Sequence, residues 1–358
     1  MATLFDSVSF AHGTSMKNRF MLAPLTNQQS HADGRLSDDE YRWLTMRAQG
    51  GFGLTMTCAS HVDARGQGFP GQLGCFGDQH LEGLTRLSHG LKHHDTLAIV
   101  QLHHAGRRSP AELIGQSPVA PSRDDGTGAV ALSTDEVQAL VASFVAAAQR
   151  SERAGFDGVE IHGAHDYVVC EFLNGELNVR TDQYGGSIEN RARLIFEIAA
   201  GIRQQCRPDF HLALRLSPEM FGMKTRDIVE VYSMAVDSGH FDLIDMSLWS
   251  VFKEASDPDF AGQRLIDIFA NLPRGNVRLA VAGHLYTAAD MRACLDAGVD
   301  IVALGRAAIT NHNAPLLIQS NPDFSMRELP VPREILAAEG LGETFLTYMS
   351  GWKGFVGE

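Results

Sequence analysis

Residues 134–162, TDEVQALVASFVAAAQRSERAGFDGVEIH, decide the fold because they join a helical pattern to a strand pattern. Apolar side chains recur near a period of 3.6 over 134–154, for example at Val137, Val141 and Phe144, which predicts an amphipathic helix. The apolar segment 157–162 follows after one glycine-containing turn, as expected of a strand in a parallel sheet covered on both faces. A helix and a strand in this order form one unit of an α/β fold.

The same alternation recurs along the whole chain. Between the apolar segments lie longer stretches with helical spacing, the pattern of βα units around a parallel sheet. Eight segments are candidate strands, at 19–24, 53–58, 97–102, 157–162, 211–216, 242–247, 277–283 and 300–305. We therefore predict an α/β fold, a (β/α)8 TIM barrel formed by 1–358 as a single domain. Short apolar runs around a turn within 4–20 predict an N-terminal β-hairpin cap, and we expect the tail from Asn321 to pack on the barrel or on a neighbouring subunit.

Composition narrows the classes of function. The 358 residues include 30 basic and 43 acidic side chains, a formal charge of −13, which argues against nucleic acid or an anionic membrane surface as partner. The five cysteines form no CxxC pair and have no short spacing suited to zinc or an iron–sulfur cluster. The start of the chain lacks a signal-peptide pattern, and no long uncharged apolar run follows. We expect a cytoplasmic enzyme that acts on a small-molecule substrate.

A polar loop directly after the fourth candidate strand carries the densest set of reactive side chains. His162, His165 and Tyr167 lie within six residues, at the strand end that faces the active site in a barrel of this kind. Two imidazoles can donate hydrogen bonds to one oxygen and stabilise enolate charge there. Tyr167 is protonated near neutrality and can act as a general acid.

Two other interpretations of this loop are open from spacing alone. The histidines could satisfy backbone groups at the strand end while Tyr167 packs. They could also form a metal pair, but the HxxH spacing lacks a third nearby ligand and the glutamate of HExxH, so we expect no metal.

The loops after the seventh and eighth candidate strands are the usual phosphate site of such barrels. They contain Gly283, Gly305 and Arg306. Glycines permit close backbone approach to a phosphate, and an arginine adds charge-assisted hydrogen bonds. A plain strand-to-helix turn also uses glycine, so it is the position in the strand order that favours phosphate binding.

The segment HGAHDY (162–167), followed by RTDQYGGSIENR (180–191), resembles the central signature of the Old Yellow Enzyme family of NADH:flavin oxidoreductases. Further segments match the family in order along the chain: KNRFMLAPLTN (17–27), VQLHHAGRRSP (100–110), LRLSPE (214–219), VAGH (281–284) and VALGRAAI (302–309).

The resemblance implies an FMN bound over the barrel mouth and reduced by NADPH or NADH. In such a ping-pong ene-reductase, hydride then passes to the activated C=C bond of an α,β-unsaturated carbonyl or nitro compound. Two alternatives remain: a flavin-dependent dehydrogenase or demethylase running in the oxidative direction, and a barrel that binds flavin without catalysis. The resemblance also suggests a homodimer or homotetramer.

The resemblance assigns roles residue by residue. It places Thr26 near the flavin ring carbonyl, Gln101 at the pyrimidine edge and Arg215 beside the negatively charged part of the reduced ring. His162 and His165 would bind the substrate oxygen and Tyr167 would supply the proton. The implied cofactor-binding residues are Ala23, Pro24, Leu25, Thr26, Ala59, Gln101, His162, Arg215, Gly283, Gly305 and Arg306.

The sequence departs from the family pattern in the substrate loop. Asp166 stands where the family usually has glycine, and FLNG occupies 172–175 where FLSP is usual. The extra carboxylate could turn toward solvent, or could change substrate charge preference and raise the pKa values of the histidines. Thr26 replaces the cysteine of some bacterial relatives, and Gln28 stands where some carry a substrate-facing tyrosine, so the family's substrate range is not transferred.

Overall fold

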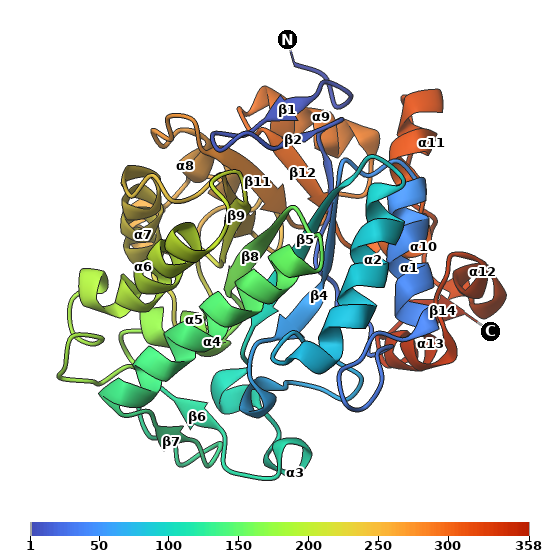
Figure 1. Cartoon of the computed structure of the whole chain (residues 1–358). Helices are drawn as coiled ribbons and strands as arrows, with labels where there is room; N and C mark the ends of the chain where they lie inside the picture. Colours follow the sequence, from blue (N-terminus) through green and yellow to red (C-terminus); the bar gives the residue numbers. More distant parts are fainter. Residues whose placement is uncertain (1, 358) are drawn as a thin grey trace.

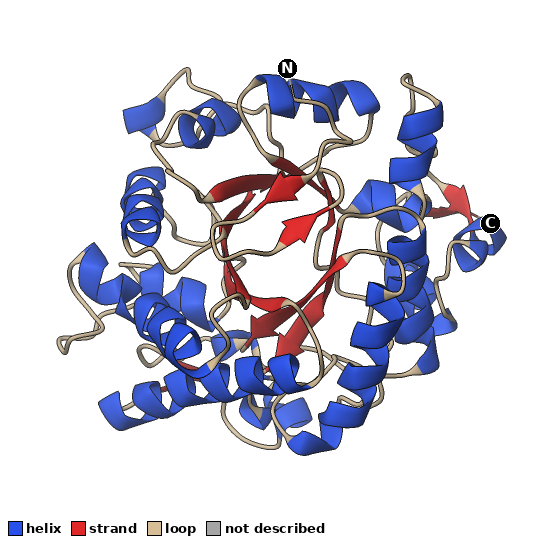
Figure 2. Ribbon diagram, turned by 45° about the horizontal axis from the view of Figure 1, so that its top comes forward, coloured by secondary structure: helices blue, strands red, loops and turns tan. Residues whose placement is uncertain are grey.

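The computed structural model describes residues 2–357 and contains a closed barrel of parallel strands surrounded by helices (Figure 2). Around the barrel the order is β3, β4, β5, β8, β9, β10, β11 and β12, which pairs again with β3. The strands are β3 (Phe20–Leu22), β4 (Leu54–His61), β5 (Leu97–His103), β8 (Gly158–Gly163), β9 (His211–Leu216), β10 (Leu243–Ser247), β11 (Arg278–Ala282) and β12 (Ile301–Leu304). Every candidate strand overlaps one of them, so the predicted (β/α)8 barrel is confirmed. β4 continues past its predicted end through an irregularity between Met56 and Ala59.

Amphipathic helices cover the outside of the barrel, and their ends follow local capping chemistry. α4 (Thr134–Arg153) begins at a capping box in which Ser133 and Glu136 satisfy each other's backbone N–H groups. α6 (Ile188–Gln205) is capped by Ser187. The other helices that follow barrel strands are α1 (Asp38–Gln49), α2 (Leu81–Lys92), α7 (Thr225–Asp237), α8 (Leu265–Ala270), α9 (Ala288–Asp296) and α10 (Arg306–Thr310).

The barrel interior is apolar at its amino end and polar at its carboxyl end. Alternate residues of each strand point inward, and on β5 this series begins with Leu97 and Ile99 and continues with Gln101 and His103. The antiparallel hairpin of β1 (Val8–Ser9) and β2 (Ser15–Met16) closes the apolar end, as predicted. Its side chains share one cluster with the interior, which includes Val8, Phe10, Met16, Met21, Leu54, Met56, Leu97 and Ile99. His211 is a polar exception at this end, where its ring packs edge-on against Phe10, and the polar side chains named on β5 lie toward the opposite mouth.

The remaining elements extend the loops and the tail. The tail packs on its own barrel, because Phe345 of α13 lies edge-on against Trp43 of α1, with ring centroids 4.8 Å apart; Figure 1 shows α12 and α13 beside α1. These elements are α3 (Ala111–Ile114), α5 (Val168–Leu173), α11 (Ala314–Ser320), α12 (Arg333–Ala338), α13 (Glu343–Ser350), β6 (Val119–Ala120), β7 (Val130–Ala131), β13 (Val331–Pro332) and β14 (Val356–Gly357). Among residues 2–357, no helix combines the length and the apolar character needed to cross a membrane.

Candidate active site

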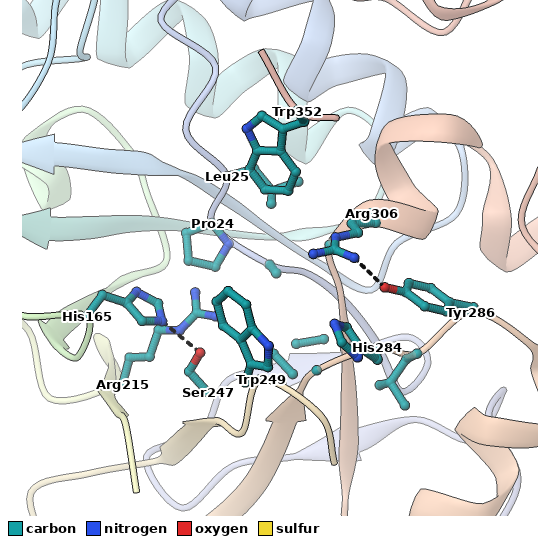
Figure 3. A pocket seen from close by; sticks show the side chains of 16 residues that line it. Pro24, Leu25, His165, Arg215, Ser247, Trp249, His284, Tyr286, Arg306 and Trp352 are labelled. Carbon is teal, nitrogen blue, oxygen red and sulfur yellow. Dashed lines mark hydrogen bonds between the residues drawn. The ribbon is translucent and has the colours of Figure 1, made fainter. Parts of the chain in front are cut away.

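A cavity of about 240 Å³ opens at the carboxyl ends of the barrel strands (Figure 3). It brings together segments that are far apart in sequence, from Ala23 at the end of β3 to Trp352 in the tail. Seven of the eleven predicted cofactor residues line it, and so does His165. Those seven are Ala23, Pro24, Leu25, Arg215, Gly283, Gly305 and Arg306.

One end of the cavity has the donors expected for a phosphate. Arg306 begins α10, and its Nη1 donates a hydrogen bond of 2.8 Å to the hydroxyl of Tyr286, which holds the guanidinium in place (Figure 3). A Cβ on Gly305 would meet only Leu25 Cδ2, at 3.7 Å, so the backbone here is accessible to a ligand. Gly283 has a different reason to be glycine, since a Cβ there would lie 2.7 Å from the carbonyl carbon of Trp249. Its small size is needed for packing of the loop after β10.

Below the cavity, four buried polar side chains form an inner layer. Gln101 Nε2 donates to Glu160 Oε1 at 2.7 Å, and Arg215 Nε lies 3.2 Å from Asp245 Oδ2. Strand register explains this grouping, because Gln101 pairs with Glu160 and Arg215 pairs with Asp245.

The inner layer has two carboxyl groups for one guanidinium. Burial, reinforced by the charge of Asp245, raises the pKa of Glu160 to about 8. Burial also raises the pKa of Asp245, and Arg215 opposes that rise. At neutral pH the pair therefore retains a proton, and the cation of Arg215 is balanced by one carboxylate.

The histidines and the tyrosine of the loop after β8 converge beside the cavity. The ring of His162 lies 5.1 Å from that of His165 and 5.2 Å from that of Tyr167, measured between centroids. Burial, and then neighbouring cationic groups, lowers the pKa of His162 well below its usual value and that of His165 to about 3. Burial raises the pKa of Tyr167. The loop thus offers two neutral imidazoles and a protonated phenol.

Neighbouring side chains hold this loop. A hydrogen bond of 2.8 Å joins His165 Nε2 to the hydroxyl of Ser247 at the end of β10 (Figure 3). Arg108 Nη1 donates to the backbone oxygen of His165 at 2.7 Å, and its guanidinium lies 5.0 Å from the centroid of the Tyr167 ring. Within residues 2–357, no group of three or more His, Cys, Asp and Glu side chains has the arrangement of a metal site.

Comparison with known proteins identifies the family. The model of the NADH:flavin oxidoreductase / NADH oxidase family matches residues 3–322. The chain belongs to this family, the Old Yellow Enzymes. It is 32% identical over 320 residues to a probable NADH-dependent flavin oxidoreductase, YqiG, of Bacillus subtilis, which covers 87% of this chain and 86% of that protein. It is also 32% identical over 341 residues to an NADPH dehydrogenase of Bacillus cytotoxicus, covering 92% and 95%.

Among solved structures, an old yellow enzyme homologue from Zymomonas mobilis superposes with a TM-score of 0.80 at 26% identity, covering 97% of this chain and 99% of that one. This Old Yellow Enzyme is therefore a flavin-dependent NAD(P)H oxidoreductase with FMN as its cofactor. The cavity fits that group: an arginine and an accessible glycine backbone suit its phosphate, and the cation of Arg215 suits the reduced ring.

Four predicted cofactor residues do not line the cavity of this Old Yellow Enzyme. Gln101 and His162 point inward from β5 and β8, but they are 1% and 4% exposed and lie beneath or beside the cavity. Ala59 pairs with Gln101 across the sheet, and Thr26 follows Leu25 in the loop after β3. The assignment of all eleven residues to the flavin stays a prediction.

Asp166, which stands in place of the family's usual glycine, has a structural role. Its backbone has φ +61°, the left-handed region that glycine adopts easily and aspartate tolerates. Its carboxylate accepts two hydrogen bonds of 2.8 Å from Arg107 Nη2, and Arg107 also pairs with Asp124 at 3.0 Å. The carboxylate is thus committed to Arg107, and burial rather than Asp166 dominates the pKa values of the two histidines.

Asn174 is the second departure from the Old Yellow Enzyme pattern, and its side chain binds the loop that contains Phe221. Its Nδ2 donates to the backbone oxygen of Phe221 at 3.1 Å, and its Oδ1 accepts from the backbone N–H groups of Glu176 and Leu177. Phe221 has φ +54° and its ring lies 6.0 Å from that of His165. Asn174 therefore holds in place the loop that carries Phe221 beside His165.

Sequence reasoning missed several side chains of the site. Ser247 ends the sixth barrel strand and Trp249 follows it, so strand-end position was the available signal. Trp352 lies in the tail, where no pattern pointed to the cavity. The others are His284 and Tyr286, together with the buried carboxyl groups of Glu160 and Asp245; His103 was expected near the site, but in a loop and without a role, and it ends β5.

Proposed function

We propose that this enzyme reduces the activated C=C bond of α,β-unsaturated carbonyl or nitro compounds by ping-pong hydride transfer. The observation that carries the proposal is the convergence of His162, His165 and Tyr167 at the edge of the FMN cavity. Two neutral donors and one general acid are the groups needed to polarise such an alkene and to protonate it. With its phosphate held by Arg306 and the backbone at Gly305, and its ring beside Arg215, FMN would supply the redox chemistry: hydride taken from NADH or NADPH and delivered to the β-carbon.

The protein side chains then have distinct tasks. His162 and His165 donate hydrogen bonds to the carbonyl or nitro oxygen, where negative charge develops as the alkene accepts hydride. Because both imidazoles are neutral, they act as dipoles and the substrate oxygen is not protonated by them. The oxygen competes with Ser247 for His165 Nε2. Tyr167 donates its phenolic proton to the α-carbon.

Changing Tyr167 to Phe tests the proposal. We expect alkene reduction to slow by about 10²-fold or more, the usual contribution of a general acid, with reduction of the flavin by NADH or NADPH largely retained. Stopped-flow absorbance of the flavin measures the two half-reactions separately. An equal loss in both half-reactions would contradict the role of Tyr167 as proton donor.

We also propose that the enzyme works as a cytoplasmic homodimer or homotetramer. All five cysteines are buried free thiols, which fits a reducing compartment. Sedimentation velocity of the purified enzyme and fractionation of cells that produce it measure the two properties.

A further inference from the structure

The end of β5 places a third imidazole in the site. His103 is fully buried, and its ring centroid lies 4.3 Å from that of Tyr167 and 5.6 Å from that of His162. It points inward two residues beyond Gln101, which puts it in the polar layer of the barrel mouth. His103 therefore lies directly behind the cavity, beside two residues to which we assign substrate chemistry.

Gln72 determines how His103 can hydrogen bond. Its Oε1 accepts from the backbone N–H of Gly68 at 2.6 Å, and its Nε2 donates to the backbone oxygen of Ala59 at 2.7 Å. A backbone N–H only donates and a backbone oxygen only accepts, so these two contacts fix which end of the amide is nitrogen. The same Nε2 lies 3.0 Å from His103 Nδ1, and its second hydrogen is available for that contact.

The orientation of Gln72 fixes the tautomer of His103. Nδ1 must accept the hydrogen bond from Gln72 Nε2, so in the neutral ring the proton is on Nε2. Burial, with further contributions from His104, His61, Arg108 and His165, lowers the pKa of His103 well below its usual value. The ring is therefore a neutral donor through Nε2.

The donor at Nε2 is buried and has no hydrogen-bond partner among the described residues 2–357. A buried donor without a partner destabilises the protein, because it has lost its hydrogen bonds to water and gained none in return. Such a group in the wall of a binding site favours a ligand that supplies an acceptor at that point.

We propose that His103 Nε2–H is a third hydrogen-bond donor for the substrate and selects alkenes activated by a group with two oxygens, a nitro or a carboxylate group. This inference rests on the proposed alkene reduction. A ketone or aldehyde oxygen has two lone pairs, and His162 and His165 use both. A third donor needs a second oxygen, and the guanidinium of Arg108, 5.0 Å from the centroid of the Tyr167 ring, favours the partial or full negative charge on such oxygens.

The tautomer is tested first, without any turnover. In the holoenzyme labelled with ¹⁵N-histidine, two-bond proton–nitrogen correlation spectra distinguish Nε2–H from Nδ1–H rings, and loss of one signal in His103→Phe identifies His103 among the 15 histidines. We expect the Nε2–H form in the wild type. In Gln72→Glu the carboxylate can only accept, so the signal should change to the Nδ1–H form or to the imidazolium. An Nδ1–H ring in the wild type would overturn the proposal.

A second variant guards against misfolding of Gln72→Glu. Gln72→Leu removes the hydrogen bond to Nδ1 without adding a charge, and we expect a mixture of both tautomers. FMN content and the flavin absorbance spectrum report whether each variant folds. A pure Nε2–H ring in folded Gln72→Leu would show that Gln72 does not set the tautomer, and would refute this part of the inference.

Selectivity is tested with two probes of the same ring size, 1-nitrocyclohexene and cyclohex-2-en-1-one. His103→Phe keeps a planar aromatic ring and removes the donor, so the ratio of kcat/KM for the nitroalkene to that for the enone should fall about tenfold, the equivalent of one ordinary hydrogen bond. Binding of the unreactive nitrocyclohexane to the oxidised holoenzyme, followed by flavin absorbance, should weaken by a similar factor relative to cyclohexanone.

The outcomes separate this inference from the proposed function. An unchanged ratio in His103→Phe, with both alkenes still reduced, refutes the role of His103 and leaves alkene reduction standing. A wild-type holoenzyme that is reduced by NADPH or NADH but transfers hydride to neither alkene refutes the proposed function itself. A lower ratio together with the Nε2–H tautomer supports the inference.

Discussion

Replacing Glu160 by glutamine should remove a pH dependence from the stability of the enzyme. Glu160 is fully buried, and its folded pKa is about 8, against an ordinary value of 4.5. A carboxyl whose pKa is raised in the folded state contributes stability below its unfolded pKa and loses that contribution as pH rises through the folded pKa. The affected window therefore runs from about pH 4.5 to about pH 8.

The size of the effect follows from proton linkage. Between about pH 5.5 and 7.5 the unfolded chain has lost this proton and the folded protein mostly retains it. The free energy of unfolding should then fall by up to about 1.4 kcal/mol per pH unit, or about 2 kcal/mol across that interval. An amide at position 160 still accepts the hydrogen bond from Gln101 and carries no titrating proton. Glu160→Gln should therefore lack this 2 kcal/mol decline.

Denaturant unfolding at the two pH values, with saturating FMN, measures the difference. Buried neutral histidines such as His162 and His165 act in the opposite direction, since their lowered pKa values make the folded protein more stable as pH rises toward 6.5. These histidines are present in both proteins, so their contributions cancel in the comparison.

Glu230→Gln, at an exposed position of α7, controls for the loss of one charge. If the wild type and Glu160→Gln change equally with pH, Glu160 is ionised in the folded enzyme and the reasoning fails.

Three further predictions concern the loops and the pH profile. Asp166→Ala loses the hydrogen bonds to Arg107 while its backbone must stay left-handed, so it should lower the free energy of unfolding by about 1–3 kcal/mol. Asp166→Gly should lower it less, because glycine adopts the left-handed backbone easily. Denaturant unfolding of both variants tests that order. Asn174→Ala releases the loop of Phe221 and should reduce kcat/KM for alkenes several-fold and stability by about 1–2 kcal/mol, while an unaltered kcat/KM would remove Asn174 from the mouth. The rate of alkene reduction, measured by stopped flow, should show no histidine ionisation from about pH 6 to 9, because both histidines are neutral and burial raises the pKa of Tyr167. An inflection of this rate near pH 6.5 would contradict the neutral imidazoles.

The barrel could be predicted because each of its units is local. The periodicity of apolar residues within a short window predicts the helix of 134–153 and the strand of 158–163. The other helices and strands of the barrel can be predicted from short windows in the same way. The site could be predicted in part for the same reason. In a parallel barrel all strand ends meet at one mouth, so residues such as Arg215 and Arg306 were expected near one another before any contact was known.

The rest depends on contacts that no short window contains. Trp352 reaches the cavity because α13 packs on α1, a contact between the two ends of the chain. The tautomer of His103 depends on Gln72, which is 31 residues away. Asp166 shows the same dependence on a distant contact. The sequence shows that aspartate replaces the usual glycine, but it does not show that Arg107 pairs with the carboxylate.

The two groups of titratable side chains around the cavity differ in how they respond to pH. The proposed substrate donors, His162 and His165, are kept neutral by burial and by nearby cations, so their hydrogen bonds should have the same strength across the physiological pH range. The inner layer is different, because Glu160 and Asp245 share one guanidinium and retain a proton that titrates near pH 8. Loss of that proton adds negative charge beside Arg215, which opposes the negative charge of reduced flavin. A pH dependence near pH 8 should therefore enter through the flavin in both half-reactions, disfavouring its reduction by NADH or NADPH and favouring hydride transfer to the alkene.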